Sequence, residues 1–477
     1  MQISLALVSH TNVGKTTLAR TLLGADIGEV RDAPHVTEFA DGQRLLQTAS
    51  GDALMLWDTP GFGDSARLVR RLRQTEQPLV GFLSATWDRL ADRPFWSSQQ
   101  ALRAVRDQAD VVLYLVNAAE SPAAAGYVAP EMDLLDWLGK PVLVLLNQLG
   151  APRPAAEEQA DVETWRAHLA SRPLVRAVLP LDAFARCWVQ EGVLLAQVAR
   201  ALDGEARAAM QRLHDAWRAR AQQRFDAAMD LLATGLARAA ADREALPAGG
   251  RLRELARRAG QALGLPRSED PAVVAQQALA LRLEQGLQQD TAALVALHGL
   301  RGDAQAEVMA RIAAHFDVRL PFDEGRAAMV GGLVTGALAG LKADLASGGL
   351  TMGGGLLAGG LIGALGAAGA ARAVNRLQGT GGGSVAWSDA ALLAQAEAAL
   401  LRYLAVAHFG RGRGDWAAGE APPHWRAQVA DALTPRSAEL PSARGAAAPA
   451  AALASVLTAA ASDVLGRLYP DAHNPWA

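Results

Sequence analysis

The stretch that decides the fold is Ser9-His10-Thr11-Asn12-Val13-Gly14-Lys15-Thr16, between the apolar run Ile3 to Val8 and the helical pattern of Thr17 to Leu23. In a strand-loop-helix turn of this kind, backbone N–H groups point inward and the helix N-terminus adds positive potential. The lysine can reach the β and γ phosphates of a nucleotide, and the following hydroxyl can ligate Mg²⁺. The stretch predicts a phosphate-binding loop, whose expected binding residues are Asn12, Val13, Gly14, Lys15, Thr16 and Thr17.

Lysine usage supports this interpretation, because only three lysines occur among 46 Lys and Arg residues. A site that keeps lysine against such a bias favours a compact ammonium over a planar guanidinium. The loop departs from the usual G-x-x-x-x-G-K-[ST] spacing in one place, where Ser9 stands at the first glycine position. The entry to the loop is therefore made by a residue with a Cβ.

A second motif follows the expected strand Ala53 to Trp57 and reads Asp58-Thr59-Pro60-Gly61. An acidic residue at the tip of a neighbouring strand can hold Mg²⁺ through water, and a glycine just beyond it lets a backbone N–H approach the γ-phosphate. The alternative is an ordinary turn, for which the same residue types are suitable. Together with the phosphate loop, the motif favours the magnesium interpretation.

These two motifs resemble those of the Era-like bacterial GTPases of the translation-factor class, and the resemblance covers residues 1–195. It implies an α/β P-loop NTPase domain with a mainly parallel sheet that uses GTP and Mg²⁺. It also implies that Glu29 to Thr37 is the first switch loop; the alternative for its threonine is a solvated loop residue. The implied catalytic residues are Lys15, Thr37 and Gly61, and the implied metal-binding residues are Thr16, Thr37 and Asp58.

The base-reading half of the family pattern is incomplete. The valine- and leucine-rich runs Asp110 to Val116 and Pro141 to Leu146 predict buried parallel strands. The second leads into Asn147-Gln148-Leu149-Gly150, where only Asn147 matches the family's Asn-Lys-x-Asp. Asp182 is a candidate replacement carboxylate, or alternatively a cap of the next helix. The resemblance favours GTP, whereas the residues leave the identity of the base open.

Hydrolysis raises a separate question, because Phe62 follows the second motif where many small GTPases place a glutamine that orients water. An apolar side chain cannot do this. Efficient turnover would need a partner's arginine, a second copy of the domain in a nucleotide-dependent homodimer, or a monovalent cation. Asn12 stands where potassium-stimulated relatives carry an asparagine that ligates K⁺; the alternative is an asparagine that makes loop hydrogen bonds.

The composition of the chain limits its class. It has 477 residues, 51% hydrophobic and 20% charged, with a formal net charge of −3, so it is globular and gives no direct nucleic-acid signal. A single cysteine, Cys187, excludes an internal disulfide framework and a thiolate zinc site. The N-terminus lacks the positive region of a signal peptide. We expect a cytoplasmic protein, either free or held at the inner face of a membrane.

The domains expected are 1–195 for the nucleotide, a helical domain at 196–325, a Gly/Ala-rich helical hairpin at 326–378 and a C-terminal helical region at 379–477. An insertion at Pro78 to Arg106 carries Trp87 and Trp96, which we expect in the core. No strand is predicted after Val193. Helices are expected at Val193 to Ala245, Ala272 to Leu300, Asp303 to Phe316, Ser388 to Phe409 and Leu453 to Tyr469, with a low-complexity linker at Pro435 to Ala452.

The Gly/Ala-rich segment Ala327 to Ala371 is nearly uncharged, and its glycines recur four residues apart. This spacing places them on one side of a helix and permits close backbone approach. Three interpretations stay open: a membrane-embedded hairpin, a soluble helix pair and a Gly-rich linker. The sequence as a whole predicts a Mg²⁺-dependent switch that couples nucleotide state to a membrane- or partner-binding helical module. The alternatives are a ribosome- or RNA-associated assembly GTPase and a nucleotide-binding scaffold with little turnover.

Overall fold

The mostly apolar strands near the N-terminus form a six-stranded sheet in the order β2-β3-β1-β4-β5-β6. All neighbouring pairs are parallel except β2 and β3, which pair antiparallel at one edge. The expectation of a mainly parallel sheet is confirmed, and β2 is a strand that the sequence analysis did not predict. The strands are β1 Gln2–Ser9, β2 Asp41–Gln47, β3 Ala53–Asp58, β4 Val111–Asn117, β5 Val142–Asn147 and β6 Val175–Pro180.

The computed structural model describes residues 1–24, 41–73, 92–149, 153–183, 187–245, 271–300, 374–379, 382–409 and 424–470. The predicted switch loop with Thr37, the tryptophan at 87, the helix at 303–316 and the Gly/Ala-rich segment 327–371 lie outside these residues. The chain divides into two compact units. The first comprises Met1–Gln223, Ala407–Trp416 and Gly466–Ala477, and the second comprises Arg224–Val406 and Ala417–Leu465. The four domain boundaries expected from the sequence stay predictions.

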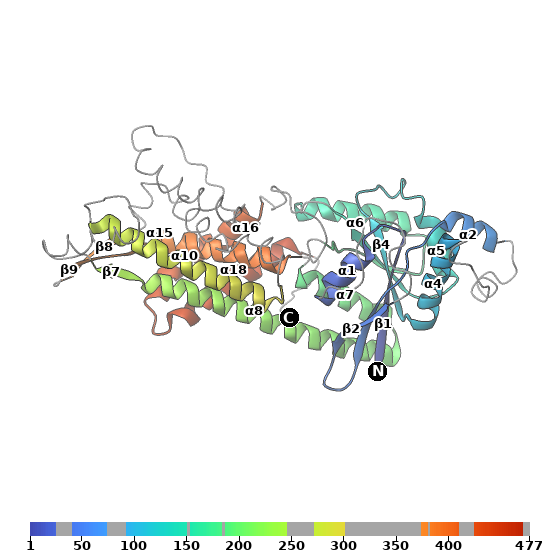
Figure 1. Cartoon of the computed structure of the whole chain (residues 1–477), viewed down its shortest axis with the longest axis horizontal. Helices are drawn as coiled ribbons and strands as arrows, with labels where there is room; N and C mark the ends of the chain where they lie inside the picture. Colours follow the sequence, from blue (N-terminus) through green and yellow to red (C-terminus); the bar gives the residue numbers. More distant parts are fainter. Residues whose placement is uncertain are drawn as a thin grey trace. The chain divides into compact units, whose positions relative to one another are not determined.

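Helices cover both faces of the sheet, as Figure 1 shows. Strand residues alternate between two buried clusters, so Val112 and Tyr114 point to one face while Leu113 and Leu115 point to the other. This explains why the central strands read as continuous apolar runs. The helices of this unit are α1 Lys15–Leu23, α2 Ser65–Leu72, α4 Arg93–Gln108, α5 Val128–Asp136, α6 Ala155–Leu169 and α7 Trp188–Ala201, followed by the first part of α8 Gly204–Ala241.

The structure decides two smaller expectations about this unit, the burial of Trp96 and the helix cap at Asp182. Trp96 lies in α4 and is buried in the core, as predicted. Cys187 is buried and is the N-cap residue of α7, where it forms a capping box with Gln190. The alternative in which Asp182 caps this helix is therefore wrong, because the helix begins at Trp188 and Cys187 caps it.

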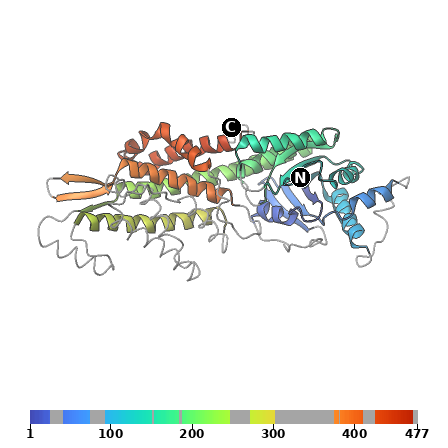
Figure 2. The same cartoon turned by 90° about the horizontal axis from the view of Figure 1, so that it is seen from above.

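The second unit is mostly helical, and its long helices run alongside one another in both views (Figures 1 and 2). Ala-, Leu- and Gln-rich stretches favour helices of this length. Phe225 and Tyr403 meet edge-to-face in its core, with ring centroids 5.5 Å apart. The helices are the remainder of α8, α10 Pro271–Leu297, α15 Asp389–Ala407, α16 His424–Leu433, the 3₁₀ helix η1 Thr434–Arg436, α17 Glu439–Arg444 and most of α18 Pro449–Leu468.

The structure corrects two expectations here. Strands do occur after Val193, because β7 Arg243–Ala245, β8 Val374–Gly379 and β9 Gly382–Trp387 form an antiparallel sheet in the order β7-β9-β8. β7 is only three residues long, β8 is mostly polar and β9 begins with two glycines, so none of them shows the period-two pattern on which a strand prediction relies. The stretch Pro435 to Ala452 is also not a linker, because it contains α17 and the first turn of α18. Alanine-rich composition reads as low complexity but has the highest helix propensity.

Candidate functional site

The phosphate loop takes the conformation that its glycine predicts. Gly14 has φ 90° and is the N-cap of α1, and Asn12 also has a positive φ, 66°. A Cβ added at Gly14 would come within 2.8 Å of Asn147 Nδ2. The loop therefore needs glycine at this point for two reasons, the left-handed backbone and the space taken by a neighbouring amide. Val13 and Thr17 are buried beside it.

The loop's departure from the family spacing at Ser9 has a structural use. Ser9 is fully buried, and its Oγ accepts a hydrogen bond of 3.0 Å from Lys15 Nζ. The same hydroxyl donates to the carbonyl of His10. A hydroxyl at the loop entry thus holds the lysine ammonium at the mouth of the loop, a contact that glycine could not make.

Lys15 is buried and lies next to the second motif. A Cβ added at Gly61 would come within 3.1 Å of its Nζ, so any side chain at that position would crowd the ammonium. Burial lowers the pKa of Lys15, and the carboxylates of Asp58 and Glu131 act in the opposite direction. The structure brings the predicted catalytic residues Lys15 and Gly61 together.

The predicted magnesium ligands Thr16 and Asp58 also meet. Thr16 Oγ1 donates to Asp58 Oδ2 at 2.6 Å, across the gap between α1 and the end of β3. A hydroxyl and a carboxylate are the hard oxygen donors that Mg²⁺ prefers, so this pair fits the ion that the fold implies. Whether Thr37 joins them is not tested, because it lies outside the described residues.

The base side of the site is organised around Asn147. This fully buried side chain donates from Nδ2 to the Val13 carbonyl at 2.6 Å and accepts from the Ala183 amide at 2.8 Å. It therefore ties the phosphate loop to the segment after β6. Asp182, the residue before Ala183, is buried, and its carboxylate accepts a hydrogen bond of 2.8 Å from the Leu149 amide. Both polar side chains are held in place by backbone groups at the site, and their role in reading a base stays a prediction.

Phe62 contributes nothing polar to this site. Its side chain is fully buried in the core under α2 and α4, and its backbone N–H donates to the Ser9 carbonyl at 2.9 Å. Phe62 therefore fixes the backbone that follows the Asp58 motif, through its buried ring and its hydrogen bond to Ser9. It cannot orient water, in agreement with the expectation from its chemistry.

A buried network beside the phosphate loop was missed by the sequence analysis. Glu131 of α5 is fully buried, and its Oε1 lies 2.7 Å from His10 Nδ1 and 2.8 Å from the Ser65 hydroxyl. Its Oε2 accepts from the Tyr114 hydroxyl at 2.7 Å. His10 also stacks on Tyr127, with ring centroids 4.7 Å apart.

This network joins four elements: the loop entry, the start of α2, β4 and α5. An ionised carboxylate only accepts hydrogen bonds, so the three facing groups are its donors. Burial and the adjacent carboxylate raise the pKa of Tyr114 well above its ordinary value, which keeps this hydroxyl a donor. No sequence motif indicates this network, because its residues are far apart in the sequence. Only the packing of α5 brings them together.

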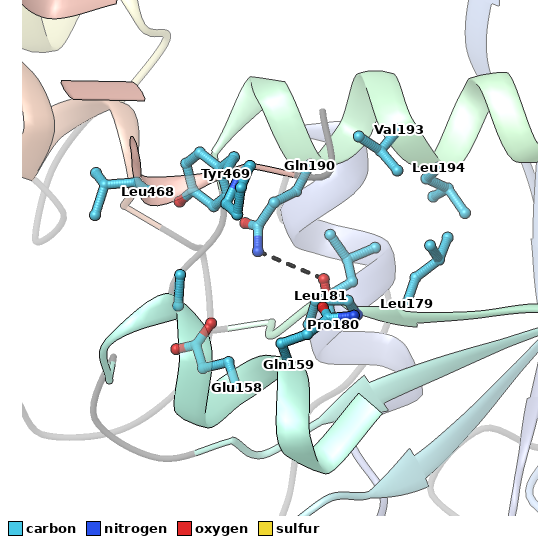
Figure 3. Close-up of a pocket in the computed structure, with 12 residues that line it drawn as sticks. Glu158, Gln159, Leu179, Pro180, Leu181, Gln190, Val193, Leu194, Leu468 and Tyr469 are labelled. Atoms are coloured by element: carbon cyan, nitrogen blue, oxygen red, sulfur yellow. Dashed lines mark hydrogen bonds between the residues drawn. The ribbon is translucent and has the colours of Figure 1, made fainter. Parts of the chain in front are cut away.

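A separate cavity lies at the outer edge of β6 (Figure 3). Its volume is about 60 Å³, and Gln190 donates across it to the Pro180 carbonyl at 3.4 Å. Glu158 lines it, and burial raises the pKa of this carboxyl. None of the phosphate-loop residues lines this cavity, so it is distinct from the candidate nucleotide site.

Two protein-family descriptions match this chain. Residues 4–148 match the family described as 50S ribosome-binding GTPase, and residues 166–451 match the one described as Domain of unknown function (DUF3482). The chain belongs to the DUF3482 family. Its N-terminal part carries a P-loop GTPase domain of the translation-factor class, so the family expected from the motifs is confirmed.

Two relatives match the GTPase domain of this DUF3482 protein. They are the GTPase Der of Syntrophotalea carbinolica, 29% identical over 150 residues, and that of Myxococcus xanthus, 28% identical over 157 residues. These matches cover 30% and 31% of the chain and 26% of each relative. The chain thus spans about a quarter of the length of the curated relatives it matches.

Solved structures with partial likeness include Era in complex with MgGDPNP and 16S ribosomal RNA. It has 18% identity and a TM-score of 0.31, over 43% of this chain and 57% of that one. Another is NFeoB from S. thermophilus bound to mGMPPNP, with 15% identity and a TM-score of 0.24, over 59% of this chain and 87% of that one.

Two helices in the described part of the chain are long and apolar enough to cross a membrane, α15 and α18. Of the apolar window in each, 78% of α15 and 44% of α18 is buried inside the protein. Core helices of soluble proteins pass the same test of length and composition, so these helices are weak evidence for a membrane span.

Proposed function

We propose that this DUF3482 protein is a Mg²⁺-dependent GTPase switch that hydrolyses the β–γ bond of GTP and couples its nucleotide state to the helical region. The observation that carries the proposal is the convergence of Lys15, Gly61 and the Thr16–Asp58 pair at one loop. Each of these groups has a separate task in phosphoryl transfer.

Lys15 would exchange its Ser9 partner for phosphate oxygens and stabilise the charge that develops on the transferring phosphoryl group. The backbone amides of the loop, opened by the left-handed Gly14, would surround the β-phosphate. The Gly61 amide would approach the γ-phosphate and report its presence.

Thr16 and Asp58 would hold Mg²⁺, the first directly and the second through water, with Thr37 as the further ligand that the family resemblance implies. The ion, when bound, would neutralise charge on the β and γ oxygens. The hydrogen bond between Thr16 and Asp58 keeps their side-chain oxygens next to each other at the expected ion position.

The test of this proposal is nucleotide binding and turnover by the full chain. We expect GTP with Mg²⁺ to bind with measurable heat in calorimetry and to be hydrolysed, and Lys15→Ala to abolish both. Lys140→Ala is the matched control, because it removes a lysine outside the site. If no common nucleoside triphosphate binds to the wild-type chain, or if both variants behave alike, the proposal is wrong.

Base preference is the finer part of the proposal. We propose that Asp182, already held in place by the Leu149 amide, supplies the carboxylate that the Gly150 position lacks. Comparing GTP with ATP binding in wild type and Asp182→Asn tests this. A preference for GTP that is lost in the variant supports it, whereas equal affinities for GTP and ATP in the wild type show relaxed specificity.

A second candidate is a nucleotide-binding scaffold with little turnover of its own, and the burial of Phe62 favours it. Turnover would then depend on a charge supplied from outside, by a partner, by a second copy of the domain or by K⁺ at the exposed Asn12. Assays with K⁺ and with Na⁺ in its place separate these cases. A rate that rises only with K⁺ and falls in Asn12→Ala supports the cation.

The target of the helical region is also a proposal, a membrane surface or a protein partner reached through residues 327–371. Flotation with liposomes that is lost on deleting this segment would support a membrane. Salt-dependent co-sedimentation with ribosomes would instead support the assembly role, for which Era bound to 16S ribosomal RNA is the analogy.

A further inference from the structure

A buried arginine in the second unit has no counter-ion among the residues that the structure describes. Arg402 of α15 is only 4% exposed. Its Nη1 makes two long hydrogen bonds of 3.4 Å, to the Leu287 carbonyl and the Thr291 hydroxyl of α10. Burial lowers the pKa of Arg402 to about 10, against the opposing effect of Asp290, so the guanidinium is still charged at neutral pH. A buried charge of this kind is costly unless it is paired.

This arginine lines a cavity of about 330 Å³ formed within the second unit by α8, α10, α15 and Trp387 of β9. The volume lies at the lower end of the range found for small-molecule sites. Most of the lining is apolar and includes Leu232, Leu236, Leu283 and Ala399. The cavity therefore suits a ligand that is mainly apolar.

Three of the lining residues carry buried hydrogen-bond donors without a partner in the described structure. They are Arg402 Nε, Trp387 Nε1 and Gln395 Nε2. All three side chains are at least nine-tenths buried. Unpaired buried donors are rare in folded proteins, since each loses its hydrogen bonds to water without a replacement. Three around one cavity point to an acceptor that fills it.

The other charges at the cavity are already balanced. Arg238 pairs with Asp290 at 2.7 Å, and Arg282 pairs with Asp242 at 3.0 Å. A further carboxylate, Glu244, reaches Arg282 at 2.8 Å but does not line the cavity. Among the lining residues, one positive charge is left over, and a single negative charge would neutralise it. This favours a carboxylate over a phosphate dianion.

We propose that this cavity binds a small organic carboxylate with an apolar body. The carboxylate accepts hydrogen bonds from the guanidinium of Arg402 and from the amide of Gln395, seven residues earlier on α15, while the apolar body fills the space between α8 and α10. The site lies wholly in the second unit, so it does not depend on the nucleotide chemistry proposed for the first.

The test is calorimetry of the full chain with hexanoate, octanoate and decanoate. Acetate, which has the charge without the chain, and 1-octanol, which has the chain without the charge, are the comparison probes. We expect one of the three longer carboxylates to bind at one site per chain, and acetate and 1-octanol to bind at least about tenfold more weakly.

Arg402→Met should weaken carboxylate binding at least about tenfold and leave 1-octanol binding unchanged, because it removes the charge and keeps an apolar side chain of similar length. Arg426→Met is the matched control: it removes an arginine that forms an exposed ion pair with Glu397. If the Arg402 variant does not fold, Gln395→Met replaces it and is expected to weaken carboxylate binding severalfold.

The proposal is overturned if none of the three longer carboxylates gives heat with the wild-type chain, which is also the result expected if another part of the chain occupies the cavity. It is equally overturned if octanoate and 1-octanol bind alike, or if the folded variants of Arg402 and Gln395 keep wild-type affinity.

Discussion

Replacing Glu131 by glutamine removes one negative charge from the interior of the first unit while keeping the size and shape of the side chain. In the wild type, this carboxylate accepts from His10, Ser65 and Tyr114 at 2.7 to 2.8 Å. A glutamine amide keeps one acceptor oxygen, but its NH₂ group replaces the second oxygen. This NH₂ donor would then face a group that is itself a donor. At least one of the three hydrogen bonds is therefore lost or reversed.

The expected size of the effect follows from the count of these bonds. A hydrogen bond to a charged group contributes about 1.5–3 kcal/mol, against about 0.5–1.5 kcal/mol for a neutral one. Loss of charge across three bonds would cost about 3 kcal/mol, and relief from burying an ion offsets part of it. We expect the opening free energy of the surrounding structure to fall by about 2–3 kcal/mol.

Hydrogen exchange of β4 amides measures this change in the full chain, because β4 carries Tyr114 and belongs to the first unit alone. Where exchange reports the opening equilibrium, a loss of about 2–3 kcal/mol speeds it roughly 30- to 140-fold. Glu163→Gln is the matched control, because this glutamate is half-exposed and its surface ion pair with Arg166 should contribute little. Exchange within threefold of wild type in Glu131→Gln would refute the network's role.

Two further predictions concern a turn and an ion pair in the same unit. Gly14→Ala should cost more stability than Gly51→Ala: both glycines have φ near 90°, but only at Gly14 would the new Cβ meet Asn147 Nδ2. Each should lose about 1–3 kcal/mol to backbone strain, and the first about 1 kcal/mol more for the displaced amide. Denaturant unfolding that shows equal losses would exclude the contact. Asp52→Asn should lower thermal stability at pH 7, and the difference should shrink as the pH falls below about 4. The Arg212 guanidinium and the Met1 ammonium hold the pKa of this carboxyl far below its ordinary value, so its contribution is present above the unfolded pKa and is lost toward the folded one. A difference that stays constant down to pH 3 would contradict this.

The first unit was largely predictable because its signals are local. In β5 Val142–Asn147, every residue before the final asparagine is apolar, which is what a strand covered on both faces requires. The phosphate loop and the Asp58 motif were predictable from spacing alone. The edge strand Asp41–Gln47 was not, because its sequence is mostly polar and only Leu46 is buried among residues 42–47.

The features that could not be predicted from the sequence depend on contacts between residues far apart in the chain. Nothing near Glu131 in the sequence shows that α5 places it against the loop entry and α2. The pairing of β8 and β9 was missed because β8 is mostly polar and β9 begins with two glycines, so neither shows a clear strand periodicity. Arg402 reads as one more arginine on an alanine-rich helix, and its burial follows only from the helices that surround it.

Asn147 has a consequence for how this protein can change. Its amide joins two loops through backbone atoms, Val13 O and Ala183 N, so it is needed whichever base lies in the site. Substitutions at neighbouring positions can therefore accumulate while this asparagine keeps the phosphate loop joined to the segment after β6.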